Sequence, residues 1–155
     1  MRRTAALGAV AGMISVLTFH QAMWAVIWLW SAGGFPRPYH LFPYPPLGLI
    51  DVVLLFLSGA VWGTVAAFAI ERFVHRQPIE TGLLVGSAAT LLHPIALQWL
   101  VLQPLSGGAP LPARIIDNVF LPALVPHIAI NMAWGIGVGL IYPALVRRAG
   151  ALGTR

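Results

Sequence analysis

Three histidines lie within apolar stretches of the sequence, at His20, His93 and His127. Neutral imidazoles are common ligands of metal ions and of haem iron. Two of them on facing helices can hold a b-type haem, and three can hold copper or zinc. The amide side chains that accompany them are Gln21, Gln98 and Asn131. These residues predict a polar pocket whose histidines are candidate cofactor ligands.

Two other uses of the same residues need no cofactor. Histidine, glutamine and asparagine hydrogen-bond between membrane helices, with each bond contributing roughly 0.6–2 kcal/mol. Intramembrane histidines also occur on proton or solute paths. The sequence therefore assigns no cofactor, and haem b or a metal ion is an alternative. Di-iron chemistry is excluded because the sequence has no Glu-x-x-His motif, and no serine motif indicates a catalytic nucleophile.

The composition indicates that these residues are in a membrane. Of the 155 residues 59% are hydrophobic and only 8% charged, and the mean hydropathy is +0.84. A soluble domain carries about 25% charged residues. We therefore expect one integral membrane domain, residues 1–155, an all-α bundle of four transmembrane helices. A span needs about 20 apolar residues, and the expected spans are 5–30, 48–73, 79–102 and 120–145. The chain has no cysteine, which excludes disulfides and thiolate ligands.

The basic residues predict the orientation, and all nine are arginine. Seven fall on the side of the N-terminus, namely Arg2, Arg3, Arg72, Arg76, Arg147, Arg148 and Arg155, whereas only Arg37 and Arg114 fall in the opposite loops. The positive-inside rule then places both termini in the cytoplasm. The arginines form no basic stripe of the kind that binds nucleic acid. Lysine is absent beside many Ala, Gly and Pro residues, which favours a bacterial origin and hence an inner membrane.

Glycine pairs predict how the spans pack. Each expected span contains one Gly-x-x-x-Gly motif, at Gly8/Gly12, Gly59/Gly63, Gly82/Gly86 and Gly135/Gly139. Small residues four apart let helix backbones approach closely. We expect tight packing toward the cytoplasmic side, and the same faces could serve self-association. The three histidines lie about 10–15 Å below the outer ends of their spans. His20, however, lies about 80° from the Gly12 face of a regular helix.

The first outer loop, residues 33–47, interleaves five prolines with four aromatic residues. Proline opposes helix and aromatic side chains favour the headgroup level. One interpretation is an ordered loop on the membrane surface. The other is a docking surface for a membrane partner.

Several fragments carry a resemblance. They are Phe19-His20-Gln21, Trp62-Gly63, Pro45-Pro46-Leu47-Gly48 and Asn131-Met132-Ala133-Trp134-Gly135. With these fragments the chain resembles a group of short, four-span bacterial inner-membrane proteins of unknown function. The resemblance implies the four-span architecture and no activity, so it assigns a role to no residue.

The sequence thus predicts a non-enzymatic polytopic inner-membrane protein. It would be an accessory subunit that associates with itself or packs against a membrane-protein partner in the bilayer, and it would bind no nucleic acid. One alternative is an electron-transfer protein that holds haem b or a metal with the three histidines. The other is a small proton or solute conduit.

Overall fold

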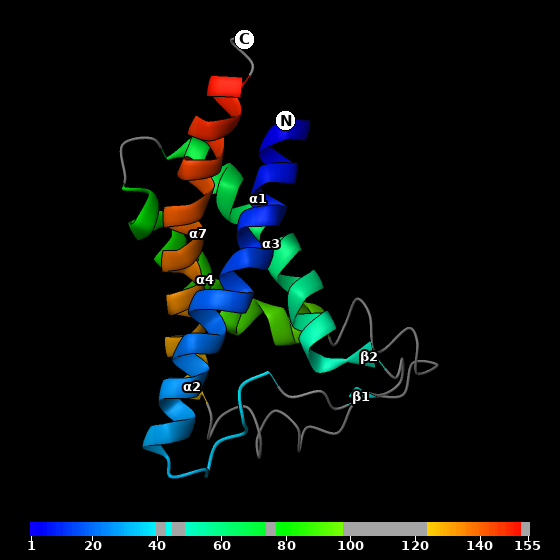
Figure 1. Ribbon diagram of the computed structural model, residues 1–155, viewed down its shortest axis with the longest axis vertical. Helices are drawn as coiled ribbons and strands as arrows, with labels where there is room; N and C mark the ends of the chain where they lie inside the picture. The colour runs from blue at the N-terminus through cyan, green and yellow to red at the C-terminus, as the bar shows by residue number, and fades with distance from the viewer. Residues whose placement is uncertain (40–42, 45–48, 74–76, 98–123, 153–155) are drawn as a thin grey trace.

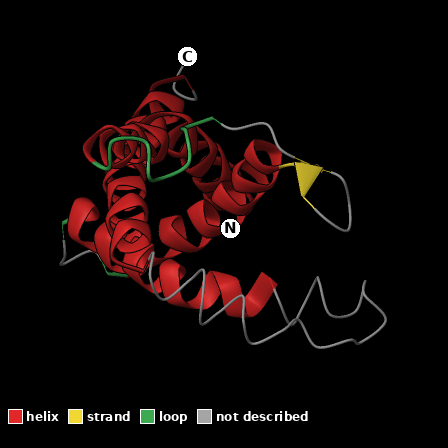
Figure 2. Cartoon of the chain, turned by 90° about the horizontal axis from the view of Figure 1, so that it is seen from below, coloured by secondary structure: helices red, strands yellow, loops and turns green. Residues whose placement is uncertain are grey.

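A computed structural model describes residues 1–39, 43–44, 49–73, 77–97 and 124–152 of the chain (Figure 1). The described residues are helical except for loops and one short strand pair. The helices are α1 (Arg2–Ser15), η1 (Val16–His20), α2 (Gln21–Trp30), α3 (Asp51–Arg72), α4 (Pro78–Leu97) and α7 (Leu124–Leu152). Strand β1 (Pro43–Tyr44) pairs antiparallel with β2 (Leu49–Ile50) at the edge of the helical bundle (Figure 2).

Three helical segments are long and apolar enough to cross a membrane: Arg2–Trp30, Val52–Arg72 and Leu124–Ala151. The first contains α1, η1 and α2 in one continuous column. A shorter apolar helix, Pro78–Leu92, lies within α4. The expected third span, 79–102, extends beyond Leu97, and its last residues lie outside the described part of the chain.

One helix continues beyond the apolar run from which its span was predicted. The expected fourth span ends at Leu145, and α7 continues to Leu152. Charged residues follow the apolar run here, at Arg147 and Arg148. Hydropathy marks where a segment leaves the apolar phase, and a helix can continue past that point because its backbone hydrogen bonds do not depend on hydropathy.

The glycine motifs lie at the contacts of two helix pairs, α1 with α3 and α4 with α7. A Cβ atom placed on Gly12 would lie 1.9 Å from the carbonyl oxygen of Gly59. A Cβ atom on Gly135 would lie 2.1 Å from the carbonyl oxygen of Gly82. No side chain fits at such distances, so the backbones of each pair are in direct contact. The glycine faces therefore pack against each other within one chain.

The two helix pairs differ in which glycines of one helix contact glycines of the other. In the first pair both glycines of α1 contact glycines of α3, since a Cβ atom on Gly8 would lie 2.7 Å from the Gly63 carbonyl oxygen. In the second pair Gly82 and Gly135 contact each other most closely, and a Cβ atom on Gly82 would also lie 3.3 Å from the Gly139 nitrogen. A Cβ atom on Gly139 would lie 2.7 Å from the Pro78 carbonyl oxygen and from the Ile79 Cα atom, at the start of α4. Gly139 therefore lies in the close contact between α4 and α7.

The register of α4 against α7 determines which backbone atoms the outer glycines face. Gly86 lies against the carbonyl oxygen of Asn131, just as Gly139 lies against Pro78 and Ile79. Gly139 still permits a close helix approach, and it extends that approach to the first turn of α4.

A third contact, between α1 and α7, joins the two pairs. The Ser15 hydroxyl donates to the Trp134 carbonyl oxygen at 2.6 Å, and the Trp134 indole N–H donates to the Gly12 carbonyl oxygen at 3.0 Å. A Cβ atom on Gly137 would lie 2.1 Å from the Ser15 hydroxyl oxygen. Ser15 is fully buried and Trp134 is 2% exposed. The reciprocal hydrogen bonds therefore fix the register of α1 against α7 in the centre of the bundle.

The helical bundle has two ends that differ in the elements they contain. The terminal end contains the start of α1, the end of α3, the start of α4 and the end of α7, and it lies at the top of Figure 1. The loop end contains α2, the loop of residues 31–39 and the start of α7.

Candidate functional site

A π-helical turn directs the predicted polar residues of the first span into the bundle. Residues Val16–His20 form η1, between two regular helices. A π-helical turn holds one residue more than an α-helical turn, so it shifts the following residues by about 100°. With that shift His20 lies about 20° from the Gly12 direction instead of about 80°. His20 is accordingly 5% exposed and Gln21 is 2% exposed.

His20 belongs to a cluster of four rings at the loop end. The indole ring of Trp24 lies at its centre and is 8% exposed. Its centroid is 5.7 Å from that of His20, 5.3 Å from that of Phe35 and 6.2 Å from that of His127. The Phe35 and His127 rings are 6.0 Å apart. These separations are those of tilted and edge-to-face aromatic contacts. The rings therefore pack against one another and join α2, the loop and α7.

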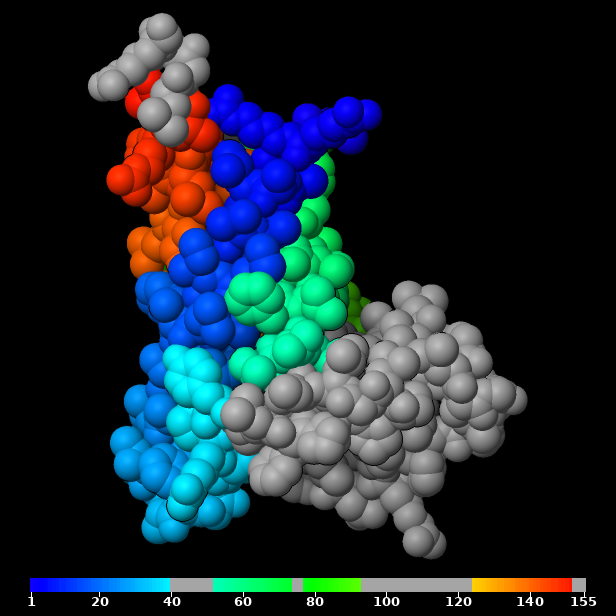
Figure 3. All heavy atoms as spheres, turned by 45° about the vertical axis from the view of Figure 1, so that its right-hand side comes forward, coloured from blue at the N-terminus to red at the C-terminus, as the bar shows by residue number. Residues whose placement is uncertain are grey.

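Hydrogen bonds from the same residues hold the loop against the first span. The Trp24 indole N–H donates to the Pro36 carbonyl oxygen at 2.8 Å, and the Tyr39 backbone N–H donates to Gln21 Oε1 at 2.8 Å. The Tyr39 hydroxyl donates to the Leu17 carbonyl oxygen. Gln21 Nε2 lies 3.4 Å from Nδ1 of His20. The space-filling view shows the loop, in cyan, covering the lower part of the first span (Figure 3).

The loop also begins with a tightly wound turn. The backbone N–H of Gly33 donates to the Trp28 carbonyl oxygen at 3.1 Å, and that of Ala32 donates to the Leu29 carbonyl oxygen at 3.2 Å. These are the two hydrogen bonds of a common helix-ending motif, whose left-handed position, usually a glycine, is held here by Ala32 with a φ of 50°. Ser31 continues the turn, because its hydroxyl accepts from the Phe35 backbone N–H at 3.0 Å. The turn therefore sends the chain back over α2 and places Phe35 beside Trp24.

The structure brings together only some of the residues predicted to share a pocket. His20, Gln21 and His127 meet at the cluster around Trp24. Asn131 instead donates from Nδ2 to the carbonyl oxygen of His127, at 3.1 Å within α7. His93 belongs to α4, but its side chain and the whole of Gln98 lie outside the described part of the chain.

The predicted three-histidine ligand set is therefore not assembled by the described residues alone. Across residues 1–39, 52–73, 77–92 and 124–151, no group of three His, Asp or Glu side chains could hold a metal ion. His93 falls outside these ranges, so the set as a whole remains a prediction.

Sequence reasoning missed Trp24 and Phe35, the two rings between the histidines. One signal in the sequence could have identified Trp24, because it follows His20 by four residues and so shares its helix face. Phe35 carries no such signal, since its position depends on the conformation of the loop.

A second polar cluster, at the terminal end, was also missed. The Thr4 hydroxyl lies 3.2 and 3.1 Å from the two carboxylate oxygens of Glu71, and the Tyr142 hydroxyl donates to the same carboxylate. Thr4 is 8% and Tyr142 2% exposed, whereas Glu71 is on the surface. Hydrogen bonds to a charged group are stronger than those between neutral groups. This cluster therefore ties α1, α3 and α7 together where they leave the apolar layer.

The polar side-chain atoms of the loop-end cluster hold the loop in position. The Trp24 N–H and the Gln21 carbonyl oxygen are both used in holding loop backbone, and Nδ1 of His20 faces the Gln21 amide. Comparisons with known proteins add nothing to this geometry, since no protein-family model, curated protein or solved structure matches the chain.

Proposed function

We propose that this chain is a non-enzymatic inner-membrane protein of a bacterium that acts as an accessory subunit and presents its outer loop to a membrane-protein partner. In this proposal the chain crosses the bilayer four times, with α4 continuing as the third span. Both termini are cytoplasmic, so the loop end faces outward. The arginine distribution and the resemblance to four-span proteins support this topology.

The observation that carries the proposal is the fixation of residues 31–39. Two buried side chains hydrogen-bond to the loop backbone: the Trp24 N–H donates to a carbonyl oxygen, and the Gln21 side-chain oxygen accepts from an N–H. Phe35 of the loop also packs against the rings of Trp24 and His127. A loop that is ordered before binding loses little conformational entropy on binding, which favours affinity. Buried polar side chains that order a surface loop in this way suit a loop that recognises a partner.

Exposed side chains at the same end suit a protein contact. Trp30 is 93% exposed, and Arg37 is exposed with its guanidinium 5.9 Å from the Trp28 ring centroid. Tyr39 is half exposed beside them. Tryptophan, tyrosine and arginine are the residues enriched at protein interfaces and among their energetic hot spots.

Site-specific photocrosslinking tests the proposal. A photoactivatable phenylalanine replaces Arg37 in the loop, and a matched variant carries it at Ala144, an exposed position on α7 at the terminal end. We expect one discrete crosslinked protein from position 37 and none from position 144. The Trp24→Phe background should weaken the position 37 crosslink, because it removes a hydrogen bond that holds the loop. Equal, diffuse crosslinking from both positions would contradict a specific partner.

One observation favours a second candidate, a haem- or metal-binding protein: His20 and His127 come from different helices and contact the same Trp24 ring. Oxidised and dithionite-reduced absorption spectra, with metal analysis on the same purified sample, separate the two candidates. An accessory protein should give a featureless visible spectrum and no stoichiometric metal. A Soret band or a bound metal that disappears in His127→Ala and His93→Ala would replace the accessory function with a ligand site.

A further inference from the structure

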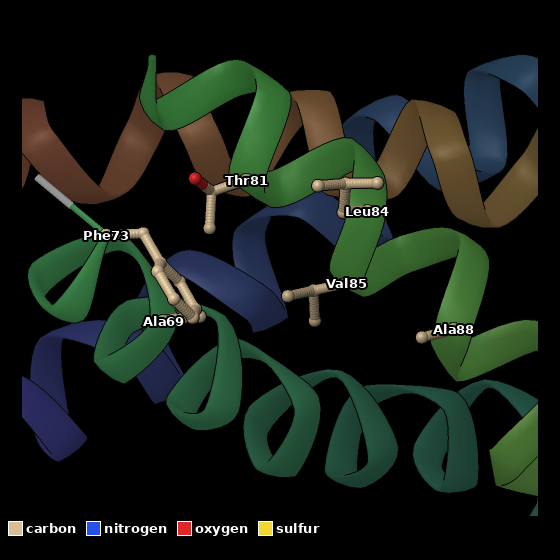
Figure 4. Close-up of a pocket in the computed structure, with 6 residues that line it drawn as sticks. All are labelled: Ala69, Phe73, Thr81, Leu84, Val85 and Ala88. Carbon is tan, nitrogen blue, oxygen red and sulfur yellow. The ribbon is translucent and has the colours of Figure 1, made fainter. Parts of the chain in front are cut away.

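A crevice lies between α3 and α4 near the terminal end, away from the ring cluster and the loop. Its volume is about 280 Å³, and its walls are almost entirely apolar. The side chains that line it are Ala69, Phe73, Thr81, Leu84, Val85 and Ala88. Figure 4 shows Thr81 and Phe73 at one end of the crevice and Ala88 at the other. The crevice therefore runs along the helices, from the end of α3 toward the middle of α4.

Thr81 is the one polar side chain in this lining. It is 3% exposed, and within the part of the chain that the structure describes its hydroxyl has no hydrogen-bond partner. Other hydroxyls in these helices donate to the carbonyl oxygen four residues earlier, as Thr90 does to Gly86 and Ser87 does to Leu83. Buried hydroxyls are costly without a partner. A ligand with an acceptor at this depth would satisfy Thr81.

Charged residues of both signs are next in the sequence to lining residues at this end of the crevice. Arg72, the last residue of α3, directly precedes Phe73, and Glu80 directly precedes Thr81 on α4, and both charged side chains are exposed. This end is also where both helices reach the edge of the apolar layer, because α3 ends at Arg72 and α4 begins at Pro78. A positive and a negative group at this level complement a zwitterionic headgroup.

We propose that the crevice binds a phosphatidylethanolamine-type lipid. One acyl chain lies along Leu84, Val85 and Ala88, and an ester carbonyl oxygen accepts a hydrogen bond from the Thr81 hydroxyl. The lipid phosphate faces Arg72, and the primary ammonium donates to Glu80. This site is independent of the accessory role, because it uses none of the residues that fix the loop.

Native mass spectrometry of the detergent-purified protein tests the headgroup without any substitution. The protein is titrated with dioleoyl phosphatidylethanolamine, phosphatidylcholine and phosphatidylglycerol. Phosphatidylcholine has the same charges but no ammonium N–H, and phosphatidylglycerol has no ammonium. We expect phosphatidylethanolamine to bind about tenfold more tightly than either, which corresponds to one charge-assisted hydrogen bond. Equal binding of the three lipids would overturn the proposal.

Variants then locate the site. Thr81→Val should weaken phosphatidylethanolamine binding about three- to tenfold. Thr90→Val is the matched control, because Thr90 is equally buried on α4 but donates within its own helix. Glu80→Gln should abolish the preference over phosphatidylcholine while both lipids still bind. Ala88→Leu should block the crevice to all three lipids.

Two outcomes of the variant experiments would overturn the site. Equal effects of Thr81→Val and Thr90→Val would assign the loss to helix stability. A protein dimer that dissociates in Ala88→Leu, with lipid binding unchanged, would assign the crevice to a second copy of the chain.

Discussion

At the terminal end and through the centre of the bundle, helix backbones touch each other at glycine, whereas at the loop end large rings fill the space between the elements. Gly12 lies directly on Gly59, and Gly135 on Gly82. At the other end Trp24, Phe35 and the two histidine rings are 5.3–6.2 Å apart. Helices in backbone contact must move apart to admit an added side-chain atom, whereas packed ring side chains can rearrange. The rigid part therefore defines the fold, and the adaptable part holds the loop.

The largest effect is expected where the backbones touch. Gly12→Ala places a methyl group against the Gly59 carbonyl and must separate α1 from α3, at a cost of about 3 kcal/mol or more. The control is Gly150→Ala in α7, where a Cβ atom would meet nothing within 4 Å. Alanine there should stabilise the helix by up to about 1 kcal/mol. Unfolding in mixed micelles, followed by circular dichroism, measures both changes. Similar stabilities for the two variants would contradict the direct contact of the α1 and α3 backbones at Gly12.

An intermediate effect is expected at the loop end. Trp24→Phe keeps a ring in the cluster but removes the hydrogen bond to Pro36, which should lower the free energy of unfolding by about 1 kcal/mol. Hydrogen exchange of residues 31–39 should rise strongly while α1 and α3 stay protected, because the loop can open without the bundle. Trp28→Phe is the control, since Trp28 is less buried and its ring faces Arg37. If exchange rises equally in α1, the loop and the bundle form one cooperative unit.

The smallest effect is expected at the Thr4–Glu71–Tyr142 cluster. Tyr142→Phe and Thr4→Val each remove one hydroxyl donor from the Glu71 carboxylate. Each should cost about 0.5 kcal/mol, the lower end of the range for a hydrogen bond, because Glu71 is exposed and water can replace the lost donor. The double variant should show a coupling below about 1 kcal/mol in the same unfolding assay. A coupling of several kcal/mol would make this cluster a second rigid element of the terminal end.

The sequence predicted the helical class and the small-residue faces through composition and spacing. Apolar run length predicted four spans, and among the described residues three helices are confirmed as long and apolar enough to cross a membrane. Spacing indicated that Gly8 and Gly12 share a face, but not that α3 is their partner. It likewise paired Gly139 with Gly135, but not with the start of α4. Partner and register depend on how the spans arrange in space, and a periodic pattern on one helix carries no information about either.

The ring cluster could not be predicted for a more specific reason. Nothing in Val-Leu-Thr-Phe-His distinguishes a π-helical turn from an α-helical turn, so the angular position of His20 was calculated for a regular helix. The π-helical turn is held in place by tertiary contacts, such as Phe19 and Ser15 against Gly137. Its existence therefore depends on α7, more than a hundred residues along the chain.

The π-helical turn also affects how the first span can change over time. It is equivalent to a single inserted residue, so the helical periodicity of the residues before the turn does not continue in phase after it. Each part of the span therefore has its own helical frame, which sets the residues that face the bundle. Substitutions before Val16 act in the frame of the glycine contacts, and those after His20 act in the frame of the loop. A lineage that lost one residue from Val16–His20 would regain a regular helix, and Gln21 and Trp24 would still face the bundle. A lineage whose turn became α-helical without a deletion would instead rotate Gln21 and Trp24 by about 100°, toward lipid, although every residue of the glycine face would be unchanged.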